Sequence, residues 1–94
     1  MLTKINGLED VILFIEQVID EGTNIHPDDD FINYININTN ERSYSKAEAI
    51  MRNQLMNECF IICNLEKKDI YALTNEVYLK RTGLDRFIPL PSNE

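Results

Sequence analysis

One histidine and three aspartates form the sharpest polar cluster in the sequence. The cluster consists of His26, Pro27, Asp28, Asp29 and Asp30. An imidazole with carboxylates suits a divalent transition metal, and carboxylates alone suit Ca²⁺ or Mg²⁺. Counted from Asp28, however, Asn33 and Thr39 stand where a calcium-binding EF-hand loop needs Gly and Glu. His26, Asp28 and Asp30 are therefore weak candidate ligands, and a solvated loop or an acidic binding surface is favoured.

Negative charge is concentrated in one quarter of the chain. The net charge is −7, and residues 9–30 contain eight acidic residues but no Lys or Arg, whereas acids and bases balance over residues 31–94. Such a field attracts basic partners and repels nucleic acid and membrane surfaces. We predict an acidic partner-binding patch made by side chains of the first helix and the loop after it: Glu9, Glu16, Asp20, Asp28, Asp29 and Asp30.

The sequence lacks the residue patterns of a common catalytic site. It has one histidine, no serine in a nucleophile-elbow pattern, and three scattered glycines that form no phosphate-binding loop. Cys59 and Cys63 lie four residues apart on one face of an expected helix, a geometry that suits a disulfide badly. We expect free thiols that pack as small hydrophobic groups. The sequence therefore predicts a non-enzymatic protein without a cofactor.

Hydrophobic periodicity predicts the first and last of three helices. Residues 7–21 carry apolar side chains at helical spacing, with Asn6 as the expected N-cap. Residues 70–82 follow the same rule between Asp69, a capping residue, and Gly83, which suits the position just after a helix.

The middle helix is predicted to extend from the capping box of Ser45 and Glu48 to about residue 65. Its second half is apolar nearly all round. A helix with that profile is buried on several sides, so we expect Phe60 to lie in the core.

A short hairpin is predicted between the first and middle helices. Residues 31–37 mix Ile and Tyr with Asn in partial alternation, residues 38–41 are turn-like, and residues 42–44 can return as a second strand. The predicted fold is α+β, mainly α, with three helices and one hairpin in a single domain over residues 1–94. The last segment, residues 84–94, is expected to pack on the core.

The apolar runs are too short to cross a membrane. The longest, residues 11–15 and 59–63, have five residues each, whereas a spanning helix needs about 20. The N-terminal segment is also a poor secretory signal, because acids follow soon after Lys4. We therefore expect a cytoplasmic protein that does not bind membranes. Its composition, rich in Ile and Asn, favours a bacterial or phage protein.

Three functions are compatible with these features. The favoured one is a small acidic interaction protein that docks on a basic protein partner, in the manner of an inhibitor, antitoxin or immunity protein. Direct binding of nucleic acid is not expected, because the bases are few and scattered. One alternative is a homo-oligomeric accessory protein whose middle helix packs on a second copy. The other is a module that binds a divalent cation or small ligand at His26 and residues 28–30.

Overall fold

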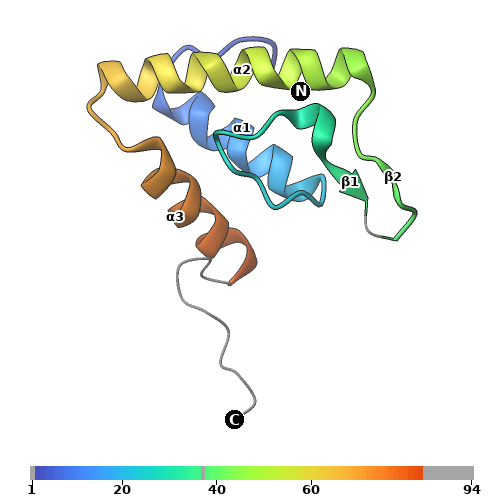
Figure 1. The fold of residues 1–94 in the computed structure, drawn as a ribbon. Coiled ribbons are helices and arrows are strands. Elements are labelled where there is room, and N and C mark those ends of the chain that lie inside the picture. Colours follow the sequence, from blue (N-terminus) through green and yellow to red (C-terminus); the bar gives the residue numbers. More distant parts are fainter. Residues whose placement is uncertain (1, 37, 84–94) are drawn as a thin grey trace.

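The computed structural model describes residues 2–36 and 38–83. These contain α1 (Leu8–Asp20), the short 3₁₀ helix η1 (Phe31–Asn33), β1 (Ile35–Asn36), β2 (Glu41–Arg42), α2 (Lys46–Leu65) and α3 (Ile70–Thr82). The antiparallel hairpin pairs Ile35 with Arg42 and lies between α1 and α2. The predicted α+β, mainly α fold is confirmed. In Figure 1, α2 lies across the top of the molecule, with α1 and α3 below it. The predicted packing of residues 84–94 lies outside the described residues.

Local hydrogen bonds determine where α2 and α3 begin. Ser45 Oγ accepts a hydrogen bond from the backbone N–H of Glu48 at 3.2 Å, and Glu48 Oε1 accepts one from the N–H of Ser45 at 2.8 Å. Asp69 caps two backbone N–H groups at the start of α3. Gly83 ends that helix with a φ of 75°, a left-handed conformation that favours glycine. These predicted boundaries are confirmed.

The start of α1 differs from the prediction. Gly7, not Asn6, is the N-cap, and no side chain caps the helix there. The backbone N–H of Asn6 instead donates to Asp10 Oδ2 at 2.9 Å. A carboxylate in the first turn also suits the positive end of the helix dipole. The pattern predicted that the Asn6 side chain would cap the helix. Instead, the backbone of Asn6 is bound by Asp10, an acid inside the helix.

The core forms where α1 packs between α2 and α3. Its largest fully buried side chains are Phe14, Phe31, Ile15, Ile25, Leu55, Val11 and Val18. Phe31 packs against Phe14 and Tyr44, with ring centroids 6.2 Å and 5.7 Å apart. To reach these rings, Phe31–Asn33 turns as a 3₁₀ helix. The prediction of an extended strand over residues 31–37 is therefore wrong in its first half.

The second half of α2 is buried on one side only. Cys59 and Cys63 face the core, but Phe60 is half-buried and Ile61 and Leu65 are exposed. The expectation that this half is buried on several sides, with Phe60 in the core, is therefore wrong. No helix in the described part of the chain is long and apolar enough to span a membrane.

Both cysteines are free and buried, as predicted. Burial raises the pKa of the Cys59 thiol to about 12 and also raises the pKa of Cys63. Both side chains therefore remain protonated and apolar in character near neutral pH.

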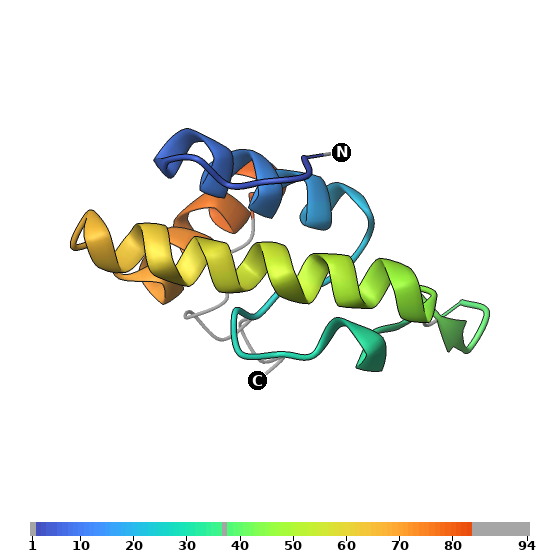
Figure 2. The ribbon, with the colours of Figure 1, turned by 90° about the horizontal axis from the view of Figure 1, so that it is seen from above.

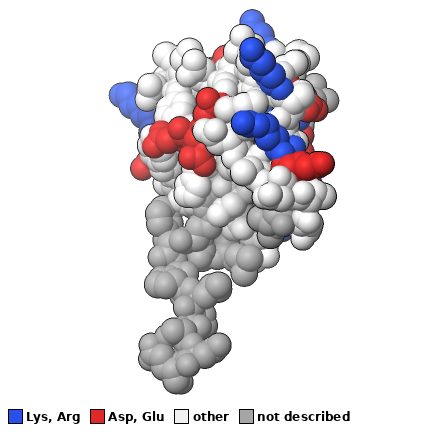
Figure 3. Space-filling model, turned by 45° about the vertical axis from the view of Figure 1, so that its right-hand side comes forward, with Lys and Arg blue, Asp and Glu red and all other residues white. Residues whose placement is uncertain are grey.

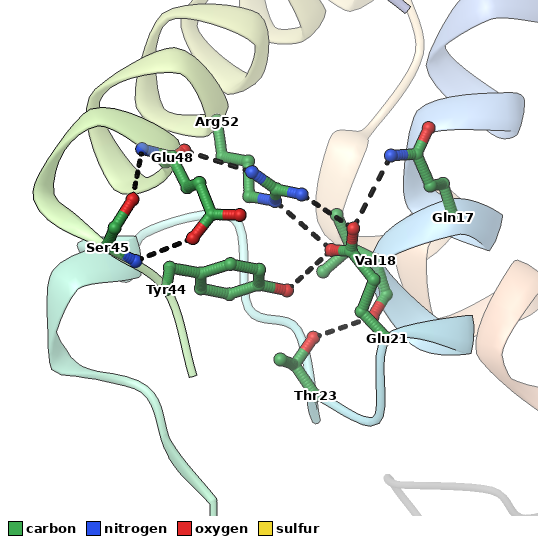
Figure 4. Close-up of polar contacts among 8 residues, drawn as sticks. All are labelled: Gln17, Val18, Glu21, Thr23, Tyr44, Ser45, Glu48 and Arg52. Atoms are coloured by element: carbon green, nitrogen blue, oxygen red, sulfur yellow. Dashed lines mark hydrogen bonds and ion pairs between the residues drawn. The ribbon is translucent and has the colours of Figure 1, made fainter. Parts of the chain in front are cut away.

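A partly buried ion pair joins the end of α1 to α2 (Figure 4). Arg52 donates from Nε to Glu21 Oε1 at 3.1 Å and from Nη2 to Oε2 at 2.6 Å, and its Nη1 donates to the Glu48 carbonyl at 3.1 Å. The Tyr44 hydroxyl donates to Glu21 Oε1 at 2.6 Å, and the Arg52 guanidinium carbon lies 4.3 Å from the centre of the Tyr44 ring. Bidentate and cation–π contacts thus meet on one arginine.

The Glu21 carboxylate is ionised because its partners outweigh its burial. Burial alone would raise the pKa of Glu21, but the hydrogen bonds from Arg52 and Tyr44 and the charge of Arg52 lower it below its ordinary value. The side chains of Arg52 and Glu21 are 7 % and 26 % exposed. Removing either partner would leave the other charge without compensation in a poorly solvated position.

We predict that Phe31→Ala lowers the free energy of unfolding by about 3–5 kcal/mol, because it removes a fully buried ring. Leu13→Ala, at an exposed position of α1, should change it by no more than about 0.5 kcal/mol. Urea unfolding followed by circular dichroism measures both. Equal losses in the two variants would contradict the position of the core.

We predict that Glu21→Gln lowers the free energy of unfolding at pH 7 by about 2–3 kcal/mol, less than for a fully buried pair because Glu21 is partly exposed. The pKa of Glu21 is lower in the folded state, so the unfolded chain binds the proton first as the pH falls. The wild type should therefore lose this stability below the ordinary pKa of 4.5, and its difference from the variant should narrow.

Urea unfolding at pH 7, 5, 4 and 3 provides the measurement, with the exposed Glu66→Gln as the matched control. A difference in the free energy of unfolding between wild type and Glu21→Gln that stays constant from pH 7 to pH 3 would show that the ion pair does not contribute as described.

Candidate acidic docking site

Two aspartates of the loop after α1 are each held by a tyrosine hydroxyl. Tyr71, at the start of α3, donates to Asp28 Oδ1 at 2.6 Å. Tyr34, before the hairpin, donates to Asp29 Oδ2 at 3.0 Å and accepts a hydrogen bond from the backbone N–H of His26 at 3.0 Å. Neither hydroxyl carries a charge, so these bonds position the two carboxylates without neutralising them.

The third aspartate, Asp30, is held by α2 and by its own turn. Its Oδ1 accepts hydrogen bonds from Asn53 Nδ2 at 2.9 Å and from the backbone N–H of Ile32 at 3.0 Å. The hydrogen bond from Asn53, and then that from Ile32, lower the pKa of Asp30. Asn53 Oδ1 also accepts from the N–H of Phe31 at 3.1 Å. One amide thus attaches the acidic loop to α2.

The three aspartates line a hollow of about 380 Å³ between this loop and α2, which we call the aspartate hollow. Its residues are Pro27, Asp28, Asp29, Asp30, Asn53, Met56, Asn57 and Phe60. Carboxylates are the strongest acceptors for guanidinium and ammonium groups. Apolar atoms such as those of Met56 and Phe60 suit the methylene stem that carries such a group. The hollow therefore has the chemistry to accept a Lys or Arg side chain.

Two other predicted acids are engaged within the protein. Arg81, at the end of α3, donates from Nε to Asp20 Oδ1 at 2.7 Å and places Nη1 3.5 Å from Glu16 Oε2. The hydrogen bond from Arg81 lowers the pKa of Asp20. In contrast, no Lys or Arg within residues 2–36 and 38–83 forms an ion pair with an aspartate of the hollow.

The structure thus places the six acids of the predicted patch in three groups. The aspartate hollow lies beside Tyr71, whereas Glu16 and Asp20 lie beside Arg81. Tyr71 and Arg81 are ten positions apart on α3, which is about 15 Å along the axis. Glu9 lies exposed in the first turn of α1. Figure 3 shows basic side chains beside acidic ones on one face of the molecule. Of these groups, only that of Glu16 and Asp20 forms an ion pair with a described Lys or Arg, and the aspartate hollow is the only one with several carboxylates that do not.

The weak metal-ligand candidates are not gathered into a site. Among the residues that the structure describes, no three His, Cys, Asp or Glu side chains form a group that could hold a metal ion. His26 is exposed, while the Asp28 carboxylate contacts α3 and the Asp30 carboxylate contacts α2. Separate donors therefore hold the carboxylates that a cation would need to bring together.

No protein-family model, curated protein or solved structure matches this chain. The role of the aspartate hollow must therefore follow from its own geometry. Sequence reasoning identified its carboxylates but missed Asn53, Asn57 and Tyr71. The two asparagines lie four residues apart and so share a helix face, which was the only local signal. Nothing local indicated Tyr71, which is 43 residues from the carboxylate that it contacts.

We predict that the triple variant Asp28→Asn, Asp29→Asn, Asp30→Asn keeps the fold, with a free energy of unfolding within about 1 kcal/mol of the wild type. Each Asn side chain retains an oxygen acceptor, and the repulsion among three adjacent charges disappears, so small opposing effects remain. Urea unfolding at pH 7 measures the difference. A loss as large as that expected for Phe31→Ala would show that the aspartates maintain the fold.

Proposed function

We propose that this protein is a small, non-enzymatic interaction protein that docks on a basic macromolecular partner through the aspartate hollow. The observation that carries the proposal is the arrangement of three adjacent, exposed carboxylates. Each is positioned by a neutral donor, and none is paired with a base in the described part of the chain. The carboxylates at the end of α1 that contact α2 and α3 pair instead with arginine, as Glu21 and Asp20 do.

Positioned carboxylates favour selective docking over diffuse attraction. Their donors fix the side chains before a partner arrives, so less conformational entropy is lost on binding. Like charges in one place also speed the encounter with a basic surface and oppose acidic ones. Inhibitors, antitoxins and immunity proteins that cover a basic nucleic-acid site are the functional type that fits this chemistry, by analogy of charge and size.

The burial of the thiols supports a non-enzymatic role. A catalytic cysteine needs an accessible thiolate, whereas Cys59 and Cys63 are buried with raised pKa values. The acids Glu21, Asp20 and Asp30 have pKa values lowered by their hydrogen-bond donors. A general acid needs the opposite, a raised pKa near neutrality.

We expect a hexa-arginine peptide to bind at the aspartate hollow, because several carboxylates there can accept guanidinium hydrogen bonds. Titration followed by ¹⁵N–¹H NMR should shift the amide signals of Asp28, Asp29, Asp30 and Asn57 first. The triple Asp→Asn variant should bind at least about tenfold more weakly, a difference of about 1.4 kcal/mol. Salt should weaken the wild-type complex, because it screens exposed charges.

The matched control carries the same change of net charge at other sites. Glu9→Gln, Glu41→Gln and Glu66→Gln remove three exposed carboxylates outside the hollow. If this control loses as much affinity as the triple Asp→Asn variant, attraction depends on net charge alone and the proposed site is wrong. Affinity capture from the native host with both triple variants as baits extends the comparison to natural partners. Equal recovery of every bound protein by the two baits would count against docking at the hollow.

A further inference from the structure

The outward face of α2 is a continuous row of mostly apolar side chains, which we call the α2 stripe. It consists of Ala47, Ile50, Met51, Gln54, Glu58, Ile61 and Leu65. Ile50, Met51, Ile61 and Leu65 are 48 %, 43 %, 57 % and 72 % exposed. In Figure 2, which looks down on α2, no other described segment crosses this helix. Single exposed apolar side chains are normal, whereas grouped ones, such as Ile50 with Met51 and Ile61 with Leu65 at the two ends of this stripe, mark an interaction surface.

The spacing of the stripe is that of a coiled-coil contact. Six of its members, all but Ile50, follow one another at alternating intervals of four and three residues. This heptad spacing keeps one line of side chains facing a partner helix. It extends from Ala47 to Leu65 and so covers almost the whole of α2, which has 20 residues and a length of about 30 Å.

We propose that the α2 stripe binds the same stripe of a second copy, with the two α2 helices antiparallel. A two-fold axis midway between Gln54 and Glu58 then places Leu65 opposite Ala47 of the second copy and Ile61 opposite its Met51. The two polar members also meet, because Gln54 faces Glu58 across the axis. The Gln54 amide can donate to that carboxylate, so each polar group meets a complementary one.

The polar members disfavour the parallel arrangement. In a parallel pair each stripe residue faces its own copy, so Glu58 would oppose Glu58 inside the contact, and like charges there are unfavourable. Glu58 Oε1 already accepts a hydrogen bond from the backbone N–H of Ile5 at 2.8 Å. Its second oxygen is the one that a Gln54 amide of the other copy would meet.

The composition of the stripe favours a second copy over a basic partner. Its only charged member is Glu58. When the stripe is paired with its own sequence in the opposite direction, apolar residues meet apolar ones and Gln54 meets Glu58. A contact about 30 Å long and about 10 Å wide covers less area than the ~800 Å² that each partner buries in a standard interface. We therefore expect a reversible dimer that forms with increasing concentration.

Dimerisation would also duplicate the proposed docking site, a consequence that rests on the proposed function. Asn53 and Asn57 place the aspartate hollow along one flank of α2. In an antiparallel pair the same flanks of the two helices lie on the same side. Both hollows would then lie on one side of the dimer, and a partner with two basic sites would bind more tightly than one with a single site.

Sedimentation equilibrium over a concentration series tests the dimer. The wild-type mass should rise from that of one chain, 11.0 kDa, toward twice this value between ~10 μM and ~1 mM, the range for a small reversible interface. Ile61→Lys should raise the dissociation constant at least about tenfold, because it buries a charge in the contact. Leu13→Lys, equally exposed but on α1, should not. Circular dichroism verifies that both variants fold.

A wild type that stays monomeric at ~1 mM would overturn the dimer, as would an equal effect of Leu13→Lys. Neither result depends on the hexa-arginine titration, because a monomer can still carry a working aspartate hollow. Conversely, a dimer that fails to bind the peptide would contradict the proposed function and leave the α2 contact intact.

Disulfide trapping tests the orientation of the helices. The variants Met51→Cys and Ile61→Cys are mixed in a glutathione redox buffer, which supplies the oxidant. Antiparallel pairing predicts disulfides between the two different variants. Parallel pairing predicts disulfides of each variant with itself, and that result would overturn the antiparallel arrangement. The native Cys59 and Cys63 are buried, and a sample without the new cysteines measures their background.

Discussion

The ion pair of Glu21 and Arg52 joins the two ends of the long connection between α1 and α2. Glu21 is the C-cap of α1, and Tyr44 immediately precedes Ser45, the N-cap of α2. Both contact Arg52 through hydrogen bonds or a ring face. In the described part of this segment, residues 22–36 and 38–43, the only regular elements are a 3₁₀ turn and two strands of two residues each, which would be marginal alone. The three aspartates of the hollow belong to this connection, so their positions depend on the contacts that join its ends.

Charge that is uneven along the sequence becomes more even in space. Residues 9–30 contain no Lys or Arg, but Arg52 and Arg81 from the second half of the chain form ion pairs with Glu21, Asp20 and Glu16. These contacts place the bases of α2 and α3 where α1 has excess negative charge. The three loop acids, in contrast, accept hydrogen bonds from neutral donors and form no ion pair with a described Lys or Arg.

The predictable parts of the fold are those that nearby residues specify. The capping box of Ser45 and Glu48, and the ends of α3 at Asp69 and Gly83, involve groups at most a few residues apart. The sequence contains those signals in full. The same holds for the cluster of loop aspartates, which was identified as a candidate site. Its donors Asn53 and Tyr71 come from distant elements, so their contribution could not be predicted.

Other predictions failed because hydrophobic periodicity does not say which element a helix or strand packs against. The second half of α2 is apolar nearly all round, and only tertiary packing decides that Cys59 is buried while Ile61 is exposed. Alternation in residues 31–37 indicated a strand. It was overridden at Phe31, because Asp30 caps a 3₁₀ turn and the ring enters the core. Local pattern and tertiary contact compete there, and contact decides.

Two chemically different surfaces, the aspartate hollow and the α2 stripe, share α2. One hydrogen bond makes the stripe easier to bury. Asn53 holds the acidic loop on one flank, while the α2 stripe carries a single charge, Glu58. An isolated carboxylate would oppose an apolar contact, because losing water costs a charged group several kcal/mol without compensation. The N–H of Ile5 already replaces part of that water. The N-terminal segment thus lowers the cost of covering α2, so an apolar partner is compatible with this one acid.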